Sequence, residues 1–274
     1  MSAKVLVTGI AGFVGMHVAK SLKQSGYQVV GIDNLNDYYD VNLKLARLQN
    51  LGLNVSSIEV EKATYQTLSF YKIDLCDRSA IDRLFEEYKF DIVINLAAQA
   101  GVRFSITHPK SYIDSNIIGF FNILDVSKNH EVKHLIYASS SSVYGNSNET
   151  PFRVQQNTDK PISMYAATKK ANELMAETYS HLHGLKTSGL RFFTVYGPFG
   201  RPDMAYFSFT KNILEGKTIR LFNGGDLHRD FTYIDDIVDA IVALSEKGPK
   251  PNEASALYNI GRGEPQLIKE FVTT

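Results

Sequence analysis

The sequence predicts an α/β fold with a doubly wound parallel sheet and a smaller C-terminal α/β lobe. Short runs of β-branched residues alternate with longer segments of helical period, which is typical of strands joined by crossover helices. A glycine-rich turn follows the first such run. The chain has 274 residues, of which 44% are apolar, so it can bury the core of one large domain with a smaller lobe attached.

The composition excludes several classes of protein. The chain carries 29 basic and 29 acidic side chains, so we expect no nucleic-acid partner. Its single cysteine, Cys76, cannot form an intrachain disulfide, and the seven scattered histidines predict no metal site. The amino terminus lacks the apolar core of a signal peptide, and no apolar stretch reaches the roughly 18 residues of a membrane span. We therefore expect a cytoplasmic protein with no membrane partner.

The first half of the chain gives the clearest pattern. Five runs are predicted to form buried strands, at residues 4–8, 28–32, 68–74, 91–96 and 134–139. Between the first two lies a helix in which apolar residues recur every four positions from Val14 to Leu22, before Gly26. A further helix is predicted over residues 77–88, because Asp77 is a capping residue. Strands and helices in this order form a parallel sheet with right-handed crossovers.

The second half repeats the pattern once and then becomes less regular. A helix near residues 164–183 and a strand near 186–191 form a sixth unit. After residue 197 we expect shorter elements, namely helices at 206–215 and 235–245 and strands at 219–222, 230–233 and 257–260. We therefore expect two domains, residues 1–196 and residues 197–274.

Two segments depart from this organisation. Residues 50–67 give no clear indication of helix or strand. Near the end, an apolar helical stripe begins at Leu267 and Ile268, but the sequence stops at Thr274 without a C-terminal cap or a following element. We expect from this that the smaller lobe is truncated.

The glycine-rich turn predicts a dinucleotide site. Gly9, Gly12 and Gly15 lie between a strand and an amphipathic helix, as in a Rossmann-type fold. Glycines let the backbone approach a pyrophosphate, and the helix N-terminus offers N–H groups to the phosphates. Asp33 ends the second strand, where its carboxylate would accept hydrogen bonds from the adenosine ribose. No Arg or Lys follows Asp33 directly, so the carboxylate would repel a 2′-phosphate, and NAD is favoured over NADP as the cofactor.

A Tyr and a Lys four residues apart form a second candidate site. On a helix, Tyr165 and Lys169 stand on one face, one turn from each other. This spacing is common on helix surfaces, but the fifth strand leads into four serines, residues 139–142, at the sheet edge where ligands of such folds bind. The ammonium group and a cationic nicotinamide would lower the pKa of the tyrosine, so that its phenolate removes a hydroxyl proton while hydride leaves the carbon. A serine hydroxyl would hold the reacting oxygen.

An ordered series of motifs resembles the extended short-chain dehydrogenase/reductases, a family that includes nucleotide-sugar epimerases and dehydratases. The resemblance covers nearly the whole chain and rests on the three glycines, Asp74-Leu75, Leu96 to Ala100, Ser140 to Gly145, Tyr165 with Lys169, Arg191 to Pro198, and Arg229-Asp230-Phe231. Within this family, segments 33–40 and 98–105 look most like those of UDP-glucuronate 4-epimerases.

The resemblance implies a role for each motif. Residues 1–196 would bind the dinucleotide and residues 197–274 the nucleotide sugar. The implied catalytic residues are Ser140, Tyr165 and Lys169. The implied cofactor residues are Gly9, Gly12, Phe13, Val14, Gly15, Asp33, Asn34, Asn36, Asp74, Leu75, Leu96, Ala97, Ala98, Tyr165 and Lys169. The implied substrate residues are Arg103, Ser141, Ser142, Thr194, Arg201, Asn223 and Arg229. Family members also pair two helices per subunit into a homodimer, which here would be those near 109–129 and 164–183.

The expected activity is that of an isomerase that epimerises UDP-glucuronate to UDP-galacturonate at C4, through a transient 4-keto sugar and NAD. Related dehydratases carry an Asp-Glu pair where this chain has Ser141-Ser142, so we expect no loss of water. The 4-keto form of glucuronate is a β-keto acid that loses carbon dioxide easily, so Thr194 and Arg201 are candidates to hold its carboxylate, with help from Arg103. Two alternatives stay open at this point: a UDP-glucose/UDP-galactose 4-epimerase, and a non-catalytic dinucleotide-binding sensor.

Overall fold

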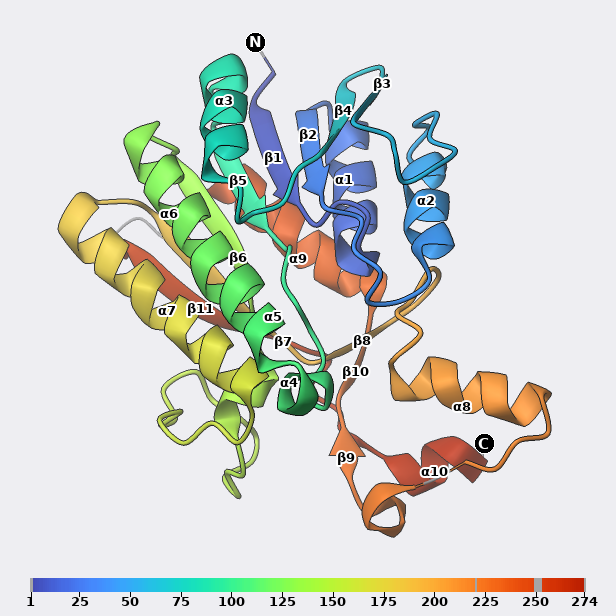
Figure 1. Ribbon diagram of the computed structural model, residues 1–274. Coiled ribbons are helices and arrows are strands. Elements are labelled where there is room, and N and C mark those ends of the chain that lie inside the picture. Colours follow the sequence, from blue (N-terminus) through green and yellow to red (C-terminus); the bar gives the residue numbers. More distant parts are fainter. Residues whose placement is uncertain (1, 220, 249–252, 274) are drawn as a thin grey trace.

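A large sheet forms the centre of the computed structural model, which describes residues 2–219, 221–248 and 253–273 (Figure 1). Its strands are β1 (Lys4–Thr8), β2 (Gln28–Asp33), β3 (Lys62–Tyr65), β4 (Leu68–Lys72), β5 (Ile92–Asn95), β6 (His134–Ser140), β7 (Thr187–Phe192) and β11 (Ser255–Ile260). They lie in the order β11-β7-β6-β5-β1-β2-β4-β3. Every neighbouring pair is parallel except β3 with β4. The predicted parallel sheet is confirmed.

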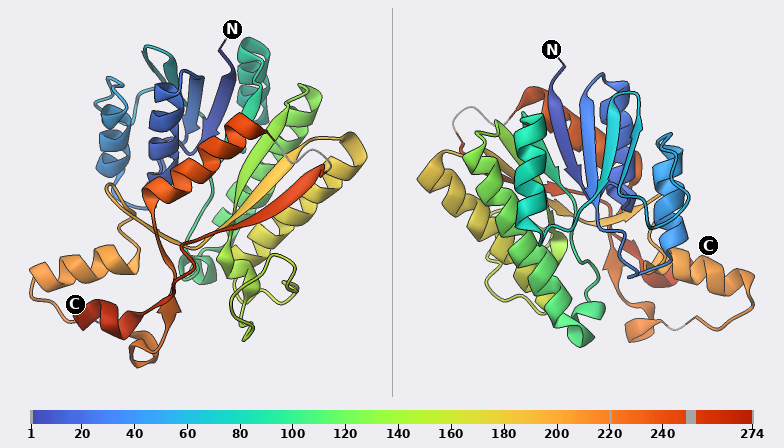
Figure 2. Two further views of the ribbon diagram at one scale, coloured as in Figure 1. Left: turned by 180° about the vertical axis from the view of Figure 1, so that it is seen from behind. Right: turned by 45° about the horizontal axis from the view of Figure 1, so that its top comes forward.

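Helices cover both faces of this sheet (Figure 2). One face carries α1 (Phe13–Gln24), α2 (Val41–Asn50) and α9 (Ile234–Lys247), and the other carries α3 (Arg78–Tyr88), α6 (Gly119–Asn129) and α7 (Met164–His183). Alternation along β1 supplies both cores, because Val5 and Val7 pack with α1 and α9 while Leu6 packs with α3 and α6. Among the described residues, no helix combines the length and the apolar character that crossing a membrane requires.

Three segments differ from the expectations. Helix α2 was not predicted, although Asp40 caps it by accepting a hydrogen bond from the Asn42 amide (2.9 Å). The unassigned residues 50–67 include β3, which pairs antiparallel with β4 at the edge of the sheet. The strand expected at 219–222 is wrong for the described residues of this range. Phe222 instead begins a 3₁₀ helix, η3 (Phe222–Gly225), which ends with two glycines at positive φ. Within the expected range, residue 220 lies outside the described residues.

The helix expected near residues 109–129 is continuous but contains a π-helical segment. It runs from α5 (Pro109–Tyr112) through η1 (Ile113–Ile118) into α6. Within η1, the Asn116 carboxamide pairs with the backbone of Gln99, accepting from its N–H (2.8 Å) and donating to its carbonyl (3.0 Å). The wider helical turn therefore fixes the loop that leaves β5, where a short helix, α4 (Phe104–Thr107), also lies.

The elements after residue 196 do not all lie together. Helix α8 (Ala205–Leu214), the strand pair β9 (His228–Arg229) and β12 (Gln266–Leu267), and α10 (Ile268–Thr273) gather below the sheet in Figure 1. Two short parallel strands, β8 (Thr194–Tyr196) and β10 (Phe231–Tyr233), connect this group to the sheet. Helix α9 returns to pack against α1, and β11 returns to pair with β7. The expected boundary at residue 196 stays a prediction.

A buried ion pair joins α7 to the sheet. Both oxygens of Glu173 accept hydrogen bonds from Arg191 of β7, each at 2.8 Å, and the two side chains are only 3% and 2% exposed. The Ser139 hydroxyl of β6 donates to the same carboxylate (2.6 Å). Arg191 also donates to the Tyr144 hydroxyl (2.9 Å), in the turn after β6. One ion pair thus fixes α7 relative to two neighbouring strands.

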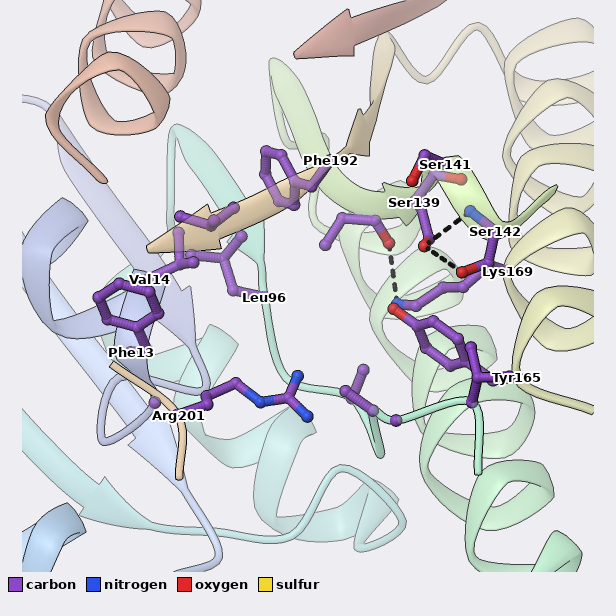
Figure 3. Close-up of a pocket in the computed structure, with 18 of the residues that line it drawn as sticks. Phe13, Val14, Leu96, Ser139, Ser141, Ser142, Tyr165, Lys169, Phe192 and Arg201 are labelled. Carbon is purple, nitrogen blue, oxygen red and sulfur yellow. Dashed lines mark hydrogen bonds between the residues drawn. The ribbon is translucent and has the colours of Figure 1, made fainter. Parts of the chain in front are cut away.

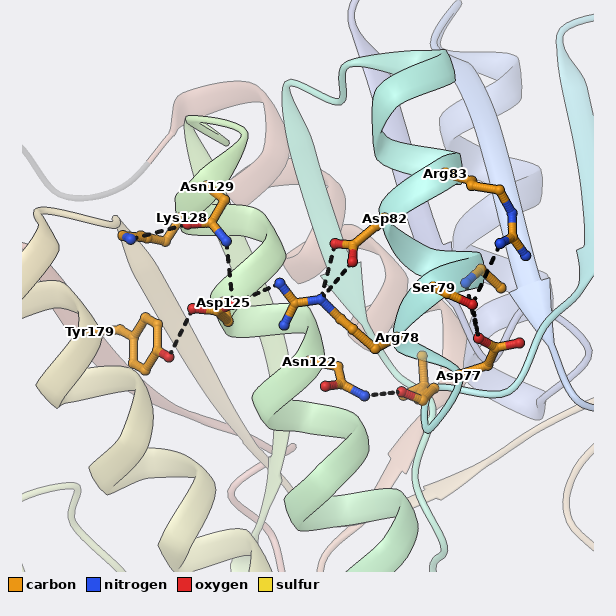
Figure 4. A network of polar contacts seen from close by, with 12 residues as sticks. Asp77, Arg78, Ser79, Asp82, Arg83, Asn122, Asp125, Lys128, Asn129 and Tyr179 are labelled. Atoms are coloured by element: carbon orange, nitrogen blue, oxygen red, sulfur yellow. Dashed lines mark hydrogen bonds and ion pairs between the residues drawn. The ribbon is translucent and has the colours of Figure 1, made fainter.

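A second polar network lies near the surface and joins α3, α6 and α7 (Figure 4). Arg78 contacts Asp82 on its own helix (3.0 Å) and Asp125 on α6 (2.7 Å). The Tyr179 hydroxyl of α7 donates to Asp125 (3.4 Å). These side chains are partly exposed, so water weakens each of their interactions.

The two networks should differ in their contribution to stability. We predict that Glu173→Gln lowers the free energy of unfolding by about 3–5 kcal/mol, because it leaves the Arg191 charge buried without its partner. The control, Asp82→Asn, should cost less than about 1 kcal/mol. Urea denaturation of both variants measures the difference, and equal losses would show that burial does not set the strength of the Glu173–Arg191 pair.

Candidate active site

One cavity of about 940 Å³ lies at the carboxyl ends of the parallel strands, where ligands of open α/β sheets bind. It brings together almost all of the residues that the sequence predicts to be functional. Its lining includes Gly9, Gly12, Phe13, Val14, Gly15, Asp33, Asn34, Asn36, Asp74, Leu75, Leu96, Ala97, Ala98, Arg103, Ser140, Ser141, Ser142, Tyr165, Lys169, Thr194, Arg201 and Arg229. The side chain of Asn223 lies outside the described part of the structure.

The loop between β1 and α1 and the first turn of α1 have room only for glycine at positions 9, 12 and 15. Gly9 has a φ of 71°, and a Cβ on it would lie 2.8 Å from the Ala97 nitrogen. A Cβ on Gly15 would lie 2.1 Å from the Gly9 carbonyl oxygen. Helix α1 begins at Phe13, next to this loop and at the cavity wall. The backbone at this helix N-terminus can therefore approach a pyrophosphate closely.

Asp33 stands at the end of β2, with a cation beside it. Lys44 of α2 places its Nζ 3.7 Å from the Asp33 carboxylate and donates to Asn36 (2.8 Å). Burial lowers the pKa of Lys44, and the Asp33 charge opposes this effect. Nearby, the Asn34 amide donates to Asp74 (2.8 Å), so the predicted cofactor residues of two strand ends contact each other. Sequence reasoning missed Lys44 because it depends on α2.

Tyr165 and Lys169 reach the cavity from α7 (Figure 3), and Ser140 at the end of β6 lines the same cavity. Ser163 caps α7 by accepting from the Ala166 amide (3.1 Å), which places Tyr165 in the first turn. Lys169 is 3% exposed; its Nζ donates to the Ala138 carbonyl (2.9 Å) and lies 6.0 Å from the centre of the Tyr165 ring.

The Ser140 hydroxyl is oriented by the turn that follows it. It accepts from the Ser142 amide (3.1 Å) and donates to the Ser142 hydroxyl (3.1 Å). Ser140, Ser141 and Ser142 line the same cavity as Tyr165, whereas the Ser139 hydroxyl donates to the buried Glu173 carboxylate.

The protein's own charges do not give Tyr165 a low pKa. Burial raises the pKa of Tyr165, and the main opposing effects come from the Arg201 charge and from a hydrogen bond with Ser140. Burial also lowers the pKa of Lys169 to about 8. Among the protein's own charges, Arg201 is the main cation that lowers the pKa of Tyr165. The expectation that Lys169 together with a bound nicotinamide brings the tyrosine toward neutrality stays a prediction.

Arg201 and Arg229 mark the part of the cavity formed by the segment after β7. Arg201 donates to both oxygens of Asp203, through Nε (3.0 Å) and Nη2 (2.5 Å). The Tyr38 hydroxyl, from the loop after β2, donates to the same carboxylate (3.1 Å). Partial burial and the charge of Arg103 lower the pKa of Arg229, so these two predicted arginines lie near each other.

Sequence reasoning did not assign Asp203 or Tyr38 a role. Asp203 could have been found from its position two residues after Arg201, since an acid at that distance can fold back onto an arginine in a loop. The contact of Tyr38 with Asp203 joins residues 165 positions apart and left no signal in the sequence.

The chain is similar to known proteins along most of its length. The model of the NAD dependent epimerase/dehydratase family matches residues 5–261. Protein CapI of Staphylococcus aureus is 48% identical over 283 residues, which cover 98% of this chain and 81% of that protein. UDP-glucuronate 4-epimerase 3 of Arabidopsis thaliana is 48% identical over 282 residues, which cover 98% of this chain and 63% of that protein.

Solved structures give the same result. The crystal structure of UDP-glucuronic acid 4-epimerase from Bacillus cereus, in complex with UDP-glucuronic acid and NAD, superposes with a TM-score of 0.86 at 34% identity. The match covers 98% of this chain and 81% of that one. On the extent of the family match and the identity to these relatives, the chain belongs to the NAD dependent epimerase/dehydratase family.

Proposed function

We propose that this chain is an NAD-dependent isomerase that interconverts UDP-glucuronate and UDP-galacturonate by epimerisation at C4. One observation carries the proposal: Ser140, Tyr165 and Lys169 share a cavity with the dinucleotide loop and with Arg201. The first three residues fit proton transfer at a sugar hydroxyl, and Arg201 fits a carboxylate. The Bacillus cereus relative, which was crystallised with UDP-glucuronic acid and NAD, supports the same substrate class.

The cavity fits NAD at the end formed by β1 and β2. The glycines fit such a site, because a Cβ on Gly9 would meet the backbone of Ala97 and a Cβ on Gly15 would meet the Gly9 carbonyl. Only glycine at these positions lets the turn and the start of α1 pack in the close arrangement that a pyrophosphate-binding loop uses. Asp33 would bind the adenosine ribose, and Leu96 to Ala98 would contact the dinucleotide along the end of β5. When bound, NAD would supply the hydride acceptor and donor that epimerisation at C4 requires.

In this proposal, Tyr165 is the acid–base residue. In its deprotonated form, its phenolate oxygen would take the proton of the sugar C4 hydroxyl and later return it. Because the hydride would also be returned to C4, the sugar would undergo no net oxidation. Ser140 would donate a hydrogen bond to the reacting oxygen, and its orientation is set by Ser142. The Lys169 Nζ donates to the Ala138 carbonyl and lies 6.0 Å from the centre of the Tyr165 ring, so it would add positive charge near the reacting oxygen.

We propose that Thr194 and Arg201 hold the sugar carboxylate. A β-keto acid loses carbon dioxide when its carboxylate bond aligns with the ketone π-system, so fixing the carboxylate prevents this loss. Arg201 can do so through two parallel hydrogen bonds. Arg103 and Arg229 supply positive charge suited to the UDP phosphates. Serines at 141 and 142 offer no acid for dehydration.

We further propose that the chain is a cytoplasmic homodimer. Helices α6 and α7 lie side by side on one face of the molecule (Figure 1) and expose large apolar side chains to solvent. These include Phe121 on α6, and Leu174 and Leu182 on α7, at 43%, 58% and 63% exposure. A second copy packed against the same helices would cover them.

The activity can be tested directly by product analysis. The protein incubated with NAD and UDP-glucuronate should yield UDP-galacturonate without a 4-keto pentose, as resolved by NMR. Tyr165→Phe should lower turnover by roughly 10²–10⁴-fold, because it removes the group that transfers the proton. UDP-galactose formed from UDP-glucose in a parallel sample, with no reaction of UDP-glucuronate, would reassign the chain to the neutral sugar. Undiminished turnover by the variant would refute the role of Tyr165.

Lys169 should make stability depend on pH. Its pKa falls from 10.5 to about 8 on folding, so the charged form destabilises the fold below pH 8, and this cost disappears as pH rises through 8 toward 10.5. We predict that Lys169→Met is more stable than the wild type at pH 7, by up to about 3 kcal/mol, and that the difference shrinks by pH 10. Urea titrations at both pH values measure it. Lys211→Met, at an exposed lysine of α8, is the control, and its stability relative to the wild type should not change with pH. An equal pH dependence of the two variants would contradict the prediction.

If the chain is a homodimer, a substitution in the proposed contact between subunits should change its mass in solution. Leu174→Lys would place a charge in the proposed α6–α7 contact, so light scattering should report a monomer where the wild type is a dimer. Leu214→Lys, at an equally apolar and 82% exposed position on α8, is the matched control and should leave the mass unchanged. A monomeric wild type would exclude the homodimer.

A further inference from the structure

Arg201, Asp203 and Tyr38 form a chain of polar contacts at the proposed substrate site. Arg201 and Asp203 belong to the loop after β8, whereas Tyr38 belongs to the loop after β2. Figure 3 shows the Arg201 guanidinium extending into the cavity from the side opposite the serine run. Asp203 therefore binds the cation that we assign to the sugar carboxylate.

The geometry of this contact is that of an arginine binding a carboxylate ligand. Nε and Nη2 lie along one edge of the guanidinium group, and each donates to a different oxygen of Asp203. Two parallel hydrogen bonds of this kind fit any carboxylate, whether it belongs to the protein or to a substrate. One edge of a guanidinium can hold only one such group at a time.

We propose that Asp203 is a specificity-determining residue whose carboxylate occupies Arg201 until a uronate carboxylate replaces it. The inference rests on the function proposed above and identifies the group that a substrate carboxylate would displace from the Nε–Nη2 edge of Arg201. Arg201 then stays paired in both states, first with Asp203 and afterwards with the sugar. A neutral sugar has no carboxylate to offer, so it cannot take the place of Asp203.

The exposure of the pair supports exchange over a purely structural role. Arg201, which lines the cavity, and Asp203 are 24% and 29% exposed, whereas Arg191 and Glu173 are almost completely buried. The two charges of a partly exposed pair can separate without either charge being left unpaired in the core.

Tyr38 gives the displaced carboxylate a remaining partner. Burial raises the pKa of Tyr38 to about 12, so its hydroxyl stays protonated and continues to donate to Asp203. Tyr38 also packs edge-on against Phe104, with ring centres 4.8 Å apart, which fixes its position. Asp203 can therefore leave Arg201 while keeping one hydrogen bond.

The test is to remove the competing charge. Asp203→Asn in the NAD-loaded protein should lower the KM for UDP-glucuronate by up to about fivefold, the upper end of the range expected for a partly exposed ion pair, and should leave the affinity for UDP-glucose unchanged. Isothermal titration calorimetry with UDP-glucuronate and with UDP-glucose compares the two binding affinities without measuring turnover. The matched control is Glu215→Gln, which breaks an exposed Lys217–Glu215 pair of the same spacing outside the cavity and should change neither value.

The outcomes separate this inference from the proposed function. A raised KM for UDP-glucuronate would mean that Asp203 orients Arg201 and would overturn the exchange, as would an equal change for both sugars or no change for either. If the wild type does not epimerise UDP-glucuronate, the proposed function fails, but the titrations still decide whether Asp203 competes with a carboxylate. Asp203→Ser also removes the charge and gives an independent measurement if the Asn variant is poorly folded.

Discussion

The active-site geometry depends on the buried pair of Glu173 and Arg191. A charge this deep in the protein is tolerated only with a partner, so α7 must sit where Glu173 meets Arg191. Lys169 lies one helical turn before Glu173, and Ser139, which donates to Glu173, directly precedes Ser140. The ion pair that fixes α7 on the sheet therefore also fixes the distance between Lys169 and Ser140 in the cavity.

Around this contact, the parallel sheet determines which residues can meet. Parallel strands end at the same edge, so the loops after β1, β2, β5 and β6 open onto one cavity although they are far apart in the sequence. The segment after β7 closes the other side and brings Arg201 and Arg229. Each loop supplies a different chemistry: glycine backbone, carboxylate, hydroxyl or guanidinium.

Sequence alone predicted the parts that depend on periodicity. The strands near β1 and β6 and the helix of Tyr165 and Lys169 follow from apolar spacing, and the convergence of the glycine loop with the serines follows from parallel strand ends. Lys44 was missed because its approach to Asp33 depends on how α2 packs beside the end of β2, which is a tertiary contact. The contact of Asp203 with Arg201 depends on how a loop folds back, and the contact of Tyr38 with Asp203 depends on tertiary packing. Neither kind of contact has a periodic signal.

The return of β11 to the sheet also has a consequence during translation. β7 gains its outer neighbour only after the ribosome has made α8, η3 and α9, which precede β11 in the chain. Until then, the nascent protein presents a strand edge with unpaired N–H and C=O groups next to a nearly complete core. Pauses in synthesis between residues 196 and 255 would prolong the time during which this edge of β7 is open to pairing with another strand.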